Sequence, residues 1–109
     1  MREKLLICVS AQQATAEYQR VLQVDPYMEA AEFFTDRKDP KNLDRAVDAA
    51  ARVDSKDSRL PYYRGVSMIM RNTDLASAAQ LLKSYISNPE KSDYPSHQSA
   101  LDWLRKIGG

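Results

Sequence analysis

The stretch LDRAVDAAARV, residues 43–53, decides the fold, because the same pattern of residue classes returns 32 residues later along the chain. Its counterpart there is LASAAQLLKSY, residues 75–85, and a third copy, AQQATAEYQRV, occupies residues 11–21. A pattern that returns at a fixed spacing of about 20–50 residues indicates a repeat architecture. The matched positions fall on one stripe of a helix: Ala11, Leu43 and Leu75; Ala14, Ala46 and Ala78; Tyr18, Ala50 and Leu82; Val21, Val53 and Tyr85.

A second set of segments alternates with the first. Residues 61–70 match residues 95–104 at a spacing of 34, so that Val66 aligns with Ala100 and Ile69 aligns with Trp103. Prolines, which favour the ends and first turns of helices, mark the boundaries of the first set. They do so at Asp25-Pro26, Asp39-Pro40 and Asn88-Pro89.

These signals predict an all-α chain of about six helices. No segment alternates with period two over the length of a strand, so we expect no sheet. Connections of two to seven residues should make neighbouring helices antiparallel. The segment 59–71 is apolar nearly all round, which predicts the central position for it. The expected helices lie roughly at 3–24, 27–37, 41–54, 59–71, 74–87 and 95–107.

The composition describes one compact domain. The 109 residues are 43% hydrophobic with a net charge of +1, which excludes a disordered tail, and three glycines exclude a collagen-like chain. No run of Lys or Arg exceeds two residues, so we expect no nucleic-acid partner, and no stretch is long enough to span a membrane. One cysteine and one histidine make neither a disulfide within the chain nor a structural zinc site, and we expect no metal or cofactor.

The amino terminus carries a poor secretory signal. Its apolar run, residues 5–9, is short, and Glu3 interrupts the basic region before it. The competing interpretation is an amphipathic helix, because apolar residues recur at helical spacing from Ile7 to Val21. That interpretation is favoured, and with it a cytoplasmic location.

Helix pairs at this period, with a small residue fixed in the second helix and a proline after it, resemble the tetratricopeptide repeat (TPR) family. The chain departs from the family pattern at Phe33 or Phe34, where the family has a small residue, and it lacks the family's tryptophan in both internal repeats. An irregular helical bundle is the alternative. The residues that carry the resemblance are Ala14, Tyr18, Asp25 and Pro26, then Ala46 and Ala50, then Gly65, Ala78, Leu82 and Pro89.

The resemblance implies a right-handed solenoid of antiparallel helix pairs and a single domain over residues 1–109. Its repeat units would be roughly 1–26, 27–58 and 59–90, followed by a closing helix at 94–107. It also implies a noncatalytic scaffold whose concave face, lined by the first helix of each pair, binds a peptide or protein segment. The clamp positions that chaperone-tail-binding members use carry Tyr62 or Tyr63 and Val66 or Ser67 here, so we do not expect that activity.

Polar rows on the helices expected to come first in each pair predict the binding face. These helices are 27–37, 59–71 and 95–107. We expect Arg64 and Arg71 to hold carboxylates of the partner, while Tyr62 or Tyr63 and Met70 give apolar contact. The alternative is that the charged residues form exposed ion pairs of little energy. The rows follow the spacing i, i+3, i+7 and comprise Glu29, Glu32 and Asp36; Arg64, Ser67 and Arg71; and Ser99, Asp102 and Lys106.

The residues bear on two further functions, catalysis and self-association. An enzyme is disfavoured, because His97 has no nucleophile motif near it and Cys8 lies on an apolar helix where a thiol is inert. Homo-oligomerisation is the alternative to partner binding, since a solenoid that starts in mid-repeat leaves an apolar edge at its first helix. Leu5, Leu6 and Trp103 would then contact a second copy.

Overall fold

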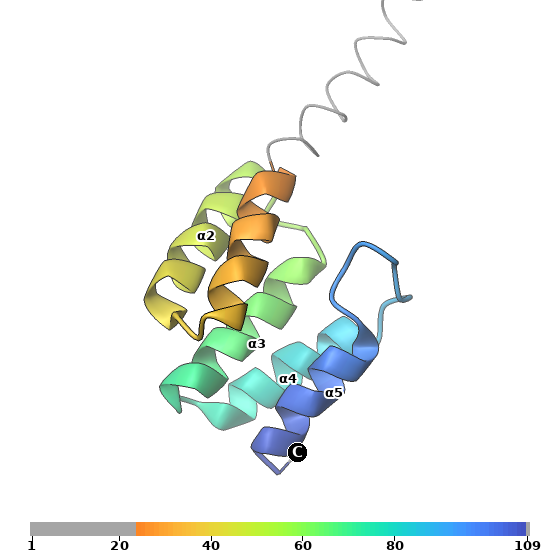
Figure 1. Cartoon of the computed structure of the whole chain (residues 1–109). Helices are drawn as coiled ribbons and strands as arrows, with labels where there is room; N and C mark the ends of the chain where they lie inside the picture. The colour runs from red at the N-terminus through yellow and green to blue at the C-terminus, as the bar shows by residue number, and fades with distance from the viewer. Residues whose placement is uncertain (1–23, 109) are drawn as a thin grey trace, which may run out of the picture.

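The structure is a computed structural model, and it describes residues 24–108. Those residues form five helices and no strand, which confirms the all-α prediction for this part of the chain. The helix predicted at 3–24, most of the repeat unit 1–26, and the residues Leu5, Leu6 and Cys8 lie outside the described residues. The helices are residues 24–36, α2 (Pro40–Val53), α3 (Arg59–Arg71), α4 (Leu75–Ile86) and α5 (His97–Lys106) (Figure 1).

Each helix packs on the next one along the chain. Helix α3 contacts α2 on one side and α4 on the other, and it also touches α5. This confirms the prediction that the segment 59–71 is the central element. Between residues 24 and 108, no helix is long and apolar enough to cross a membrane.

Capping side chains set the starts of three helices. Asp39 precedes Pro40 and accepts hydrogen bonds from the backbone N–H of Asn42 at 3.2 Å and from its side-chain amide at 2.7 Å. Asp74 and Ser96 accept a backbone N–H in the same way at the starts of α4 and α5. The predicted boundaries of α2 to α5 therefore agree with the structure to within two residues.

The break predicted at Asp25-Pro26 is wrong. Residues 24–36 are helical throughout, so Asp25 and Pro26 belong to the same helix as the segment after them. The fixed φ of proline is itself compatible with a helix, and Val24 and Met28 on either side of Pro26 are both buried in the core. Packing at these two positions therefore holds the segment helical.

Most positions of the repeated columns lie in the core of the described residues. Leu43, Ala50, Ala78 and Leu82 are fully buried, and Ala46 is nearly so. Small residues at these positions let the helix axes approach closely. Such an approach occurs at Gly65 of α3, where an added Cβ would lie 3.1 Å from the carbonyl oxygen of Ala78 and 3.1 Å from Cγ of Leu82.

Gly65→Val tests this close approach. Backbone of α4 cannot move aside as a flexible side chain would, so we expect the variant to lose about 2 kcal/mol of unfolding free energy, although valine favours a helix more than glycine does. Urea denaturation measures the change. Lys83→Val on the exposed side of α4 is the control, and equal stability of Gly65→Val and the wild type would contradict the packing described here.

Candidate functional site

A buried arginine joins three segments at the start of α3. Arg59 is only 7% exposed. Its Nη2 lies 3.0 Å from Oδ1 of Asp25 in the helix 24–36 and 2.8 Å from Oδ2 of Asp57 in the loop before α3. Its guanidinium lies 4.3 Å from the ring centre of Tyr94, in the loop between α4 and α5. One side chain therefore fixes the helix 24–36 and two loops to α3.

Both members of the main ion pair stay charged. Burial by itself would lower the pKa of Arg59, but the hydrogen bond and charge of Asp57, with a further hydrogen bond to Asp25, raise that pKa above its usual value. Burial would raise the pKa of Asp57, but hydrogen bonds from the side chain and backbone of Arg59 lower it below its usual value. The pair is therefore ionised throughout the physiological pH range.

Two adjoining cavities open beside this pair. The larger, about 680 Å³, lies between the helix 24–36, the start of α3 and the loops on either side. The smaller, about 270 Å³, continues along the helix 24–36 toward α5. We call the two cavities together the acidic groove. The residues that line both are Glu32, Tyr63, Asp93 and Tyr94.

Carboxylates dominate the lining of the acidic groove. Arg59 is the one basic residue that lines either cavity within the described residues, and it is already paired with Asp25 and Asp57. No three His, Cys, Asp or Glu of residues 24–108 are grouped so that they could hold a metal ion. The acidic lining residues are Asp25, Glu29, Glu32, Asp36, Asp54, Asp57 and Asp93.

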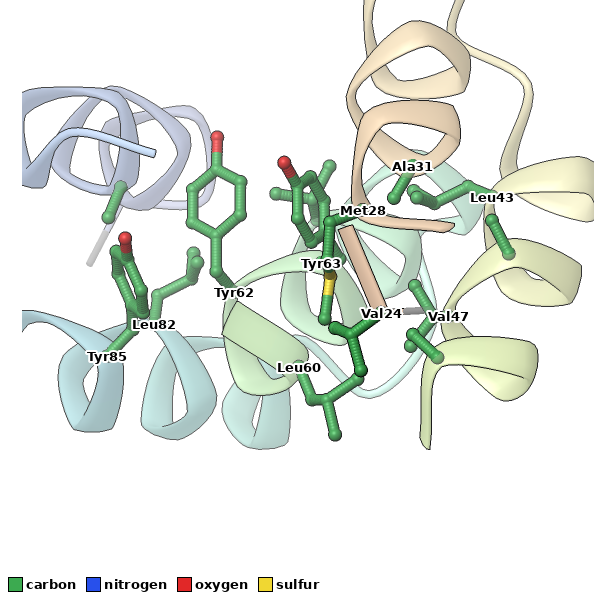
Figure 2. Packing of buried hydrophobic residues seen from close by; sticks show 14 of the residues in the cluster. Val24, Met28, Ala31, Leu43, Val47, Leu60, Tyr62, Tyr63, Leu82 and Tyr85 are labelled. Atoms are coloured by element: carbon green, nitrogen blue, oxygen red, sulfur yellow. The ribbon is translucent and has the colours of Figure 1, made fainter. Parts of the chain in front are cut away.

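Two tyrosines of α3 form part of the wall. Tyr62 and Tyr63 are both buried, their rings meet edge to face with centres 5.0 Å apart, and Figure 2 shows their hydroxyl groups pointing to the same side. Tyr63 lines both cavities, while Tyr62 lines the smaller one. Burial raises the pKa of Tyr62 to about 12 and raises that of Tyr63 further. Both hydroxyls therefore keep their protons near neutral pH.

Several contacts hold the loop between α4 and α5, which forms the far wall. The hydroxyl of Tyr85 donates to the carbonyl oxygen of Pro95, and Oε1 of Glu90 accepts the backbone N–H of His97 at 2.8 Å. Lys91 lies against the ring of Tyr94, which Arg59 also contacts. His97 packs edge-on against Tyr85 at the start of α5, and its Nε2 is buried without a hydrogen-bond partner among the described residues.

The structure separates the predicted site residues into two groups. Glu29, Glu32, Tyr62 and Tyr63 come together in the acidic groove. Met70 lies outside both cavities and packs, partly buried, against the core.

Arg64, Ser67 and Arg71 instead face α2, where Asp44 and Asp48 bind them. Arg64 lies 3.2 Å from Asp48, the hydroxyl of Ser67 donates to Asp44 at 2.5 Å, and Arg71 lies 2.8 Å from the same Asp44. None of the three lines the acidic groove. The expected basic centre of the concave face is therefore not beside its acidic wall. The pairs of Arg64 and Arg71 are exposed, as the alternative prediction of low-energy surface ion pairs expects. Their partners lie on α2, however, and not on the helix 24–36.

Sequence reasoning missed Arg59, Asp93 and Tyr94 as groove residues. One signal pointed to Arg59: it starts a central apolar helix directly after an acidic turn. Asp54 and Asp57 both accept backbone N–H groups of that turn, from Lys56 at 3.1 Å and from Arg59 at 2.9 Å.

Comparisons of the chain with family models, with curated proteins and with solved structures gave no match. The resemblance to the TPR family therefore stays a prediction from the sequence.

Asp57→Asn tests the buried pair through its pH dependence. Because the pKa of Asp57 is lowered on folding, its stabilisation is present above the unfolded pKa of about 3.9 and is lost as the pH falls through the lower folded value. We expect the variant to lose about 2 kcal/mol of unfolding free energy at pH 7 and progressively less as the pH falls below about 3.9. Urea denaturation across this range measures the difference.

Asp48→Asn is the control, because it removes a charge whose pair with Arg64 is exposed. We expect it to lose less than about 1 kcal/mol at pH 7. A loss for Asp57→Asn that does not change with pH would contradict the ionised pair.

Proposed function

We propose that this chain is a noncatalytic protein-interaction module that binds an extended peptide or protein segment in the acidic groove. The observation that carries the proposal is the origin of the lining residues. They come from the helix 24–36, from α3, from α5 and from the loops beside them. Helices α2 and α4 contribute none within the described residues.

This origin supports a concave binding face of the TPR-like kind. In a stack of helix pairs the first helices line the inner wall and the second helices form the outer one. The helices 24–36, α3 and α5 are those that the sequence pattern assigns to the first position of a pair. The groove thus lies where a solenoid would place its partner.

The two tyrosines of the lining suit binding better than proton transfer. A general base must lose its proton near the working pH, whereas burial raises the pKa of Tyr62 to about 12. Carboxylates and tyrosine hydroxyls, set along an open hollow, are suited to contact the side chains and backbone of an extended segment. We therefore propose recognition without a chemical step.

Peptides selected from a random display library on the full chain test the proposal. We expect at least one selected peptide to shift the amide resonances of residues 29–36, 62–63 and 92–99 in an NMR titration. Shifts confined to α2 and α4, or no enriched peptide, would contradict it.

Ser92→Trp provides a matched test of the same site. Ser92 lines the smaller cavity, so the indole should obstruct it and weaken the selected peptide at least tenfold. Ser55→Trp places the same side chain on an exposed turn outside the groove and should leave the affinity unchanged.

Homo-oligomerisation is the second candidate, and exposed apolar side chains favour it. Tyr27 and Phe33 on the helix 24–36 and Leu101 on α5 are large hydrophobic residues exposed to solvent, on the first and last described helices. We propose that these three side chains would contribute to end-to-end contact between copies of the chain. Trp103, the α5 residue expected at such a contact, is partly buried against the core, and Lys106 lies over its ring.

Sedimentation equilibrium distinguishes the two candidates. Self-association predicts an apparent mass that rises with concentration and returns to 12.4 kDa in the variant Phe33→Glu with Leu101→Glu. A concentration-independent mass of 12.4 kDa would reject this second candidate and leave the groove proposal unaffected.

A further inference from the structure

We infer that the segment bound by the acidic groove is basic, and that one of its Arg or Lys side chains docks where the two cavities meet, between Glu32, Asp93 and the hydroxyl of Tyr63. This inference rests on the proposed function and names the chemical class of the partner. It reverses the charge of the partner expected from Arg64 and Arg71, because those two arginines would have selected an acidic segment.

The charge of the lining is the first support. Among residues 24–108, seven carboxylates line the acidic groove against one guanidinium, and that guanidinium is already paired with Asp25 and Asp57. Within residues 24–108, no ion pair engages Glu29, Glu32, Asp36 or Asp93. These carboxylates meet from two sides, since Asp93 lies on the loop between α4 and α5 and the others on the helix 24–36. A cation between the two sides would lower their mutual repulsion.

The hydroxyl of Tyr63 is the second, independent support. Tyr63 is 97% buried, being only 3% exposed, and it lines both cavities. Its neighbour Tyr85, equally buried, donates its hydroxyl to Pro95, whereas the described residues supply no hydrogen-bond partner for the hydroxyl of Tyr63. Within the described residues, His97 Nε2 is the one buried side-chain N or O atom without a hydrogen-bond partner, so the hydroxyl oxygen of Tyr63 is not enclosed. It therefore opens to the acidic groove, where a ligand can bond to it.

Glu32, Asp93 and Tyr63 together fit a cationic side chain. A guanidinium or ammonium has several N–H donors, and the two carboxylates and the tyrosine oxygen can accept them. Charge-assisted hydrogen bonds of this kind are stronger than neutral ones. The groove would in turn reject an acidic segment, because its carboxylates would face those of the groove.

Fluorescence anisotropy with two labelled peptides of equal length tests the inference. The probes are a twelve-residue alternating Arg-Gly peptide and its Glu-Gly counterpart, added to the full chain at about 50 mM salt. We expect the Arg-Gly peptide to bind at least tenfold more tightly than the Glu-Gly peptide. We also expect its affinity to fall with added salt, which screens charges. Equal binding of the two peptides would overturn the inference.

Charge-matched variants separate docking in the groove from nonspecific attraction. Glu32→Gln with Asp93→Asn removes two carboxylates from the groove and should weaken the Arg-Gly peptide at least tenfold. Asp48→Asn with Asp102→Asn removes two exposed carboxylates outside it and should change the affinity less than twofold. Equal weakening by both pairs would show attraction to overall charge only and would overturn the inference.

Tyr63→Phe isolates the hydroxyl. We expect about a fivefold loss of affinity for the Arg-Gly peptide, which is the effect of one ordinary hydrogen bond. Tyr27→Phe removes an exposed hydroxyl outside the groove and should have no effect. Circular dichroism of every variant confirms that it is folded before binding is compared. Unchanged binding by Tyr63→Phe would remove this residue from the docking site.

The selection of peptides from the display library distinguishes a failure of the proposed function from a failure of the inference that the partner is basic. Neutral or acidic peptides that shift the groove resonances would retain the proposed function and overturn the basic class. The absence of any groove-binding peptide, together with no binding of the Arg-Gly probe, would overturn both.

Discussion

The buried guanidinium of Arg59 is the contact on which the acidic groove depends. The helix 24–36, the turn before α3 and the loop between α4 and α5 are distant in sequence, and Arg59 contacts all three through Asp25, Asp57 and Tyr94. A buried charge without partners would cost several kcal/mol, so this position requires its two carboxylates. The two carboxylates that pair with Arg59 therefore lie beside the groove, and the contacts of Arg59 hold the walls of the groove together.

The distribution of cations explains why the groove is acidic although the chain carries a net charge of only +1. The arginines of α3 pair with carboxylates of α2, since Arg64 meets Asp48 and Arg71 meets Asp44. No such pair reaches Glu29 or Glu32 within the described residues. The two faces of α3 thus differ: one is a neutralised contact with α2, and the other joins the acidic groove, where Glu29 and Glu32 have no ion pair with any of residues 24–108.

Periodicity predicted the parts of the fold that depend on local sequence and on burial. The columns of Ala46, Ala78 and Leu82 are core in the structure, and prolines and caps placed the boundaries of α2 to α5. The exception is Pro26, where packing overrides a boundary signal. The sequence could not predict how α3 is rotated. The segment 59–71 is apolar nearly all round, so its pattern marks no single buried face, and only the position of α2 determines that Arg64 faces Asp48.

The site was predictable only in part for the same reason. Glu29 and Glu32 were identified because helical spacing places them in one polar row, while Tyr62 and Tyr63 were named as apolar contacts beside such a row. Arg59 was missed because its partner Asp25 lies 34 residues away, and a long-range pair leaves no periodic signal. Asp93 and Tyr94 lie in a loop, where no periodicity exists to place them.

Hydrogen–deuterium exchange in the variant Arg59→Met tests most directly whether this arginine holds the groove together. Methionine retains the length of the side chain without its charge or donors. The account predicts that the amide of Tyr94, which bonds to the carbonyl of Lys91 at 3.1 Å, exchanges at least tenfold faster in the variant, while the amides in the middle of α4 keep their wild-type rates. Unchanged exchange at Tyr94 would contradict the central role of Arg59.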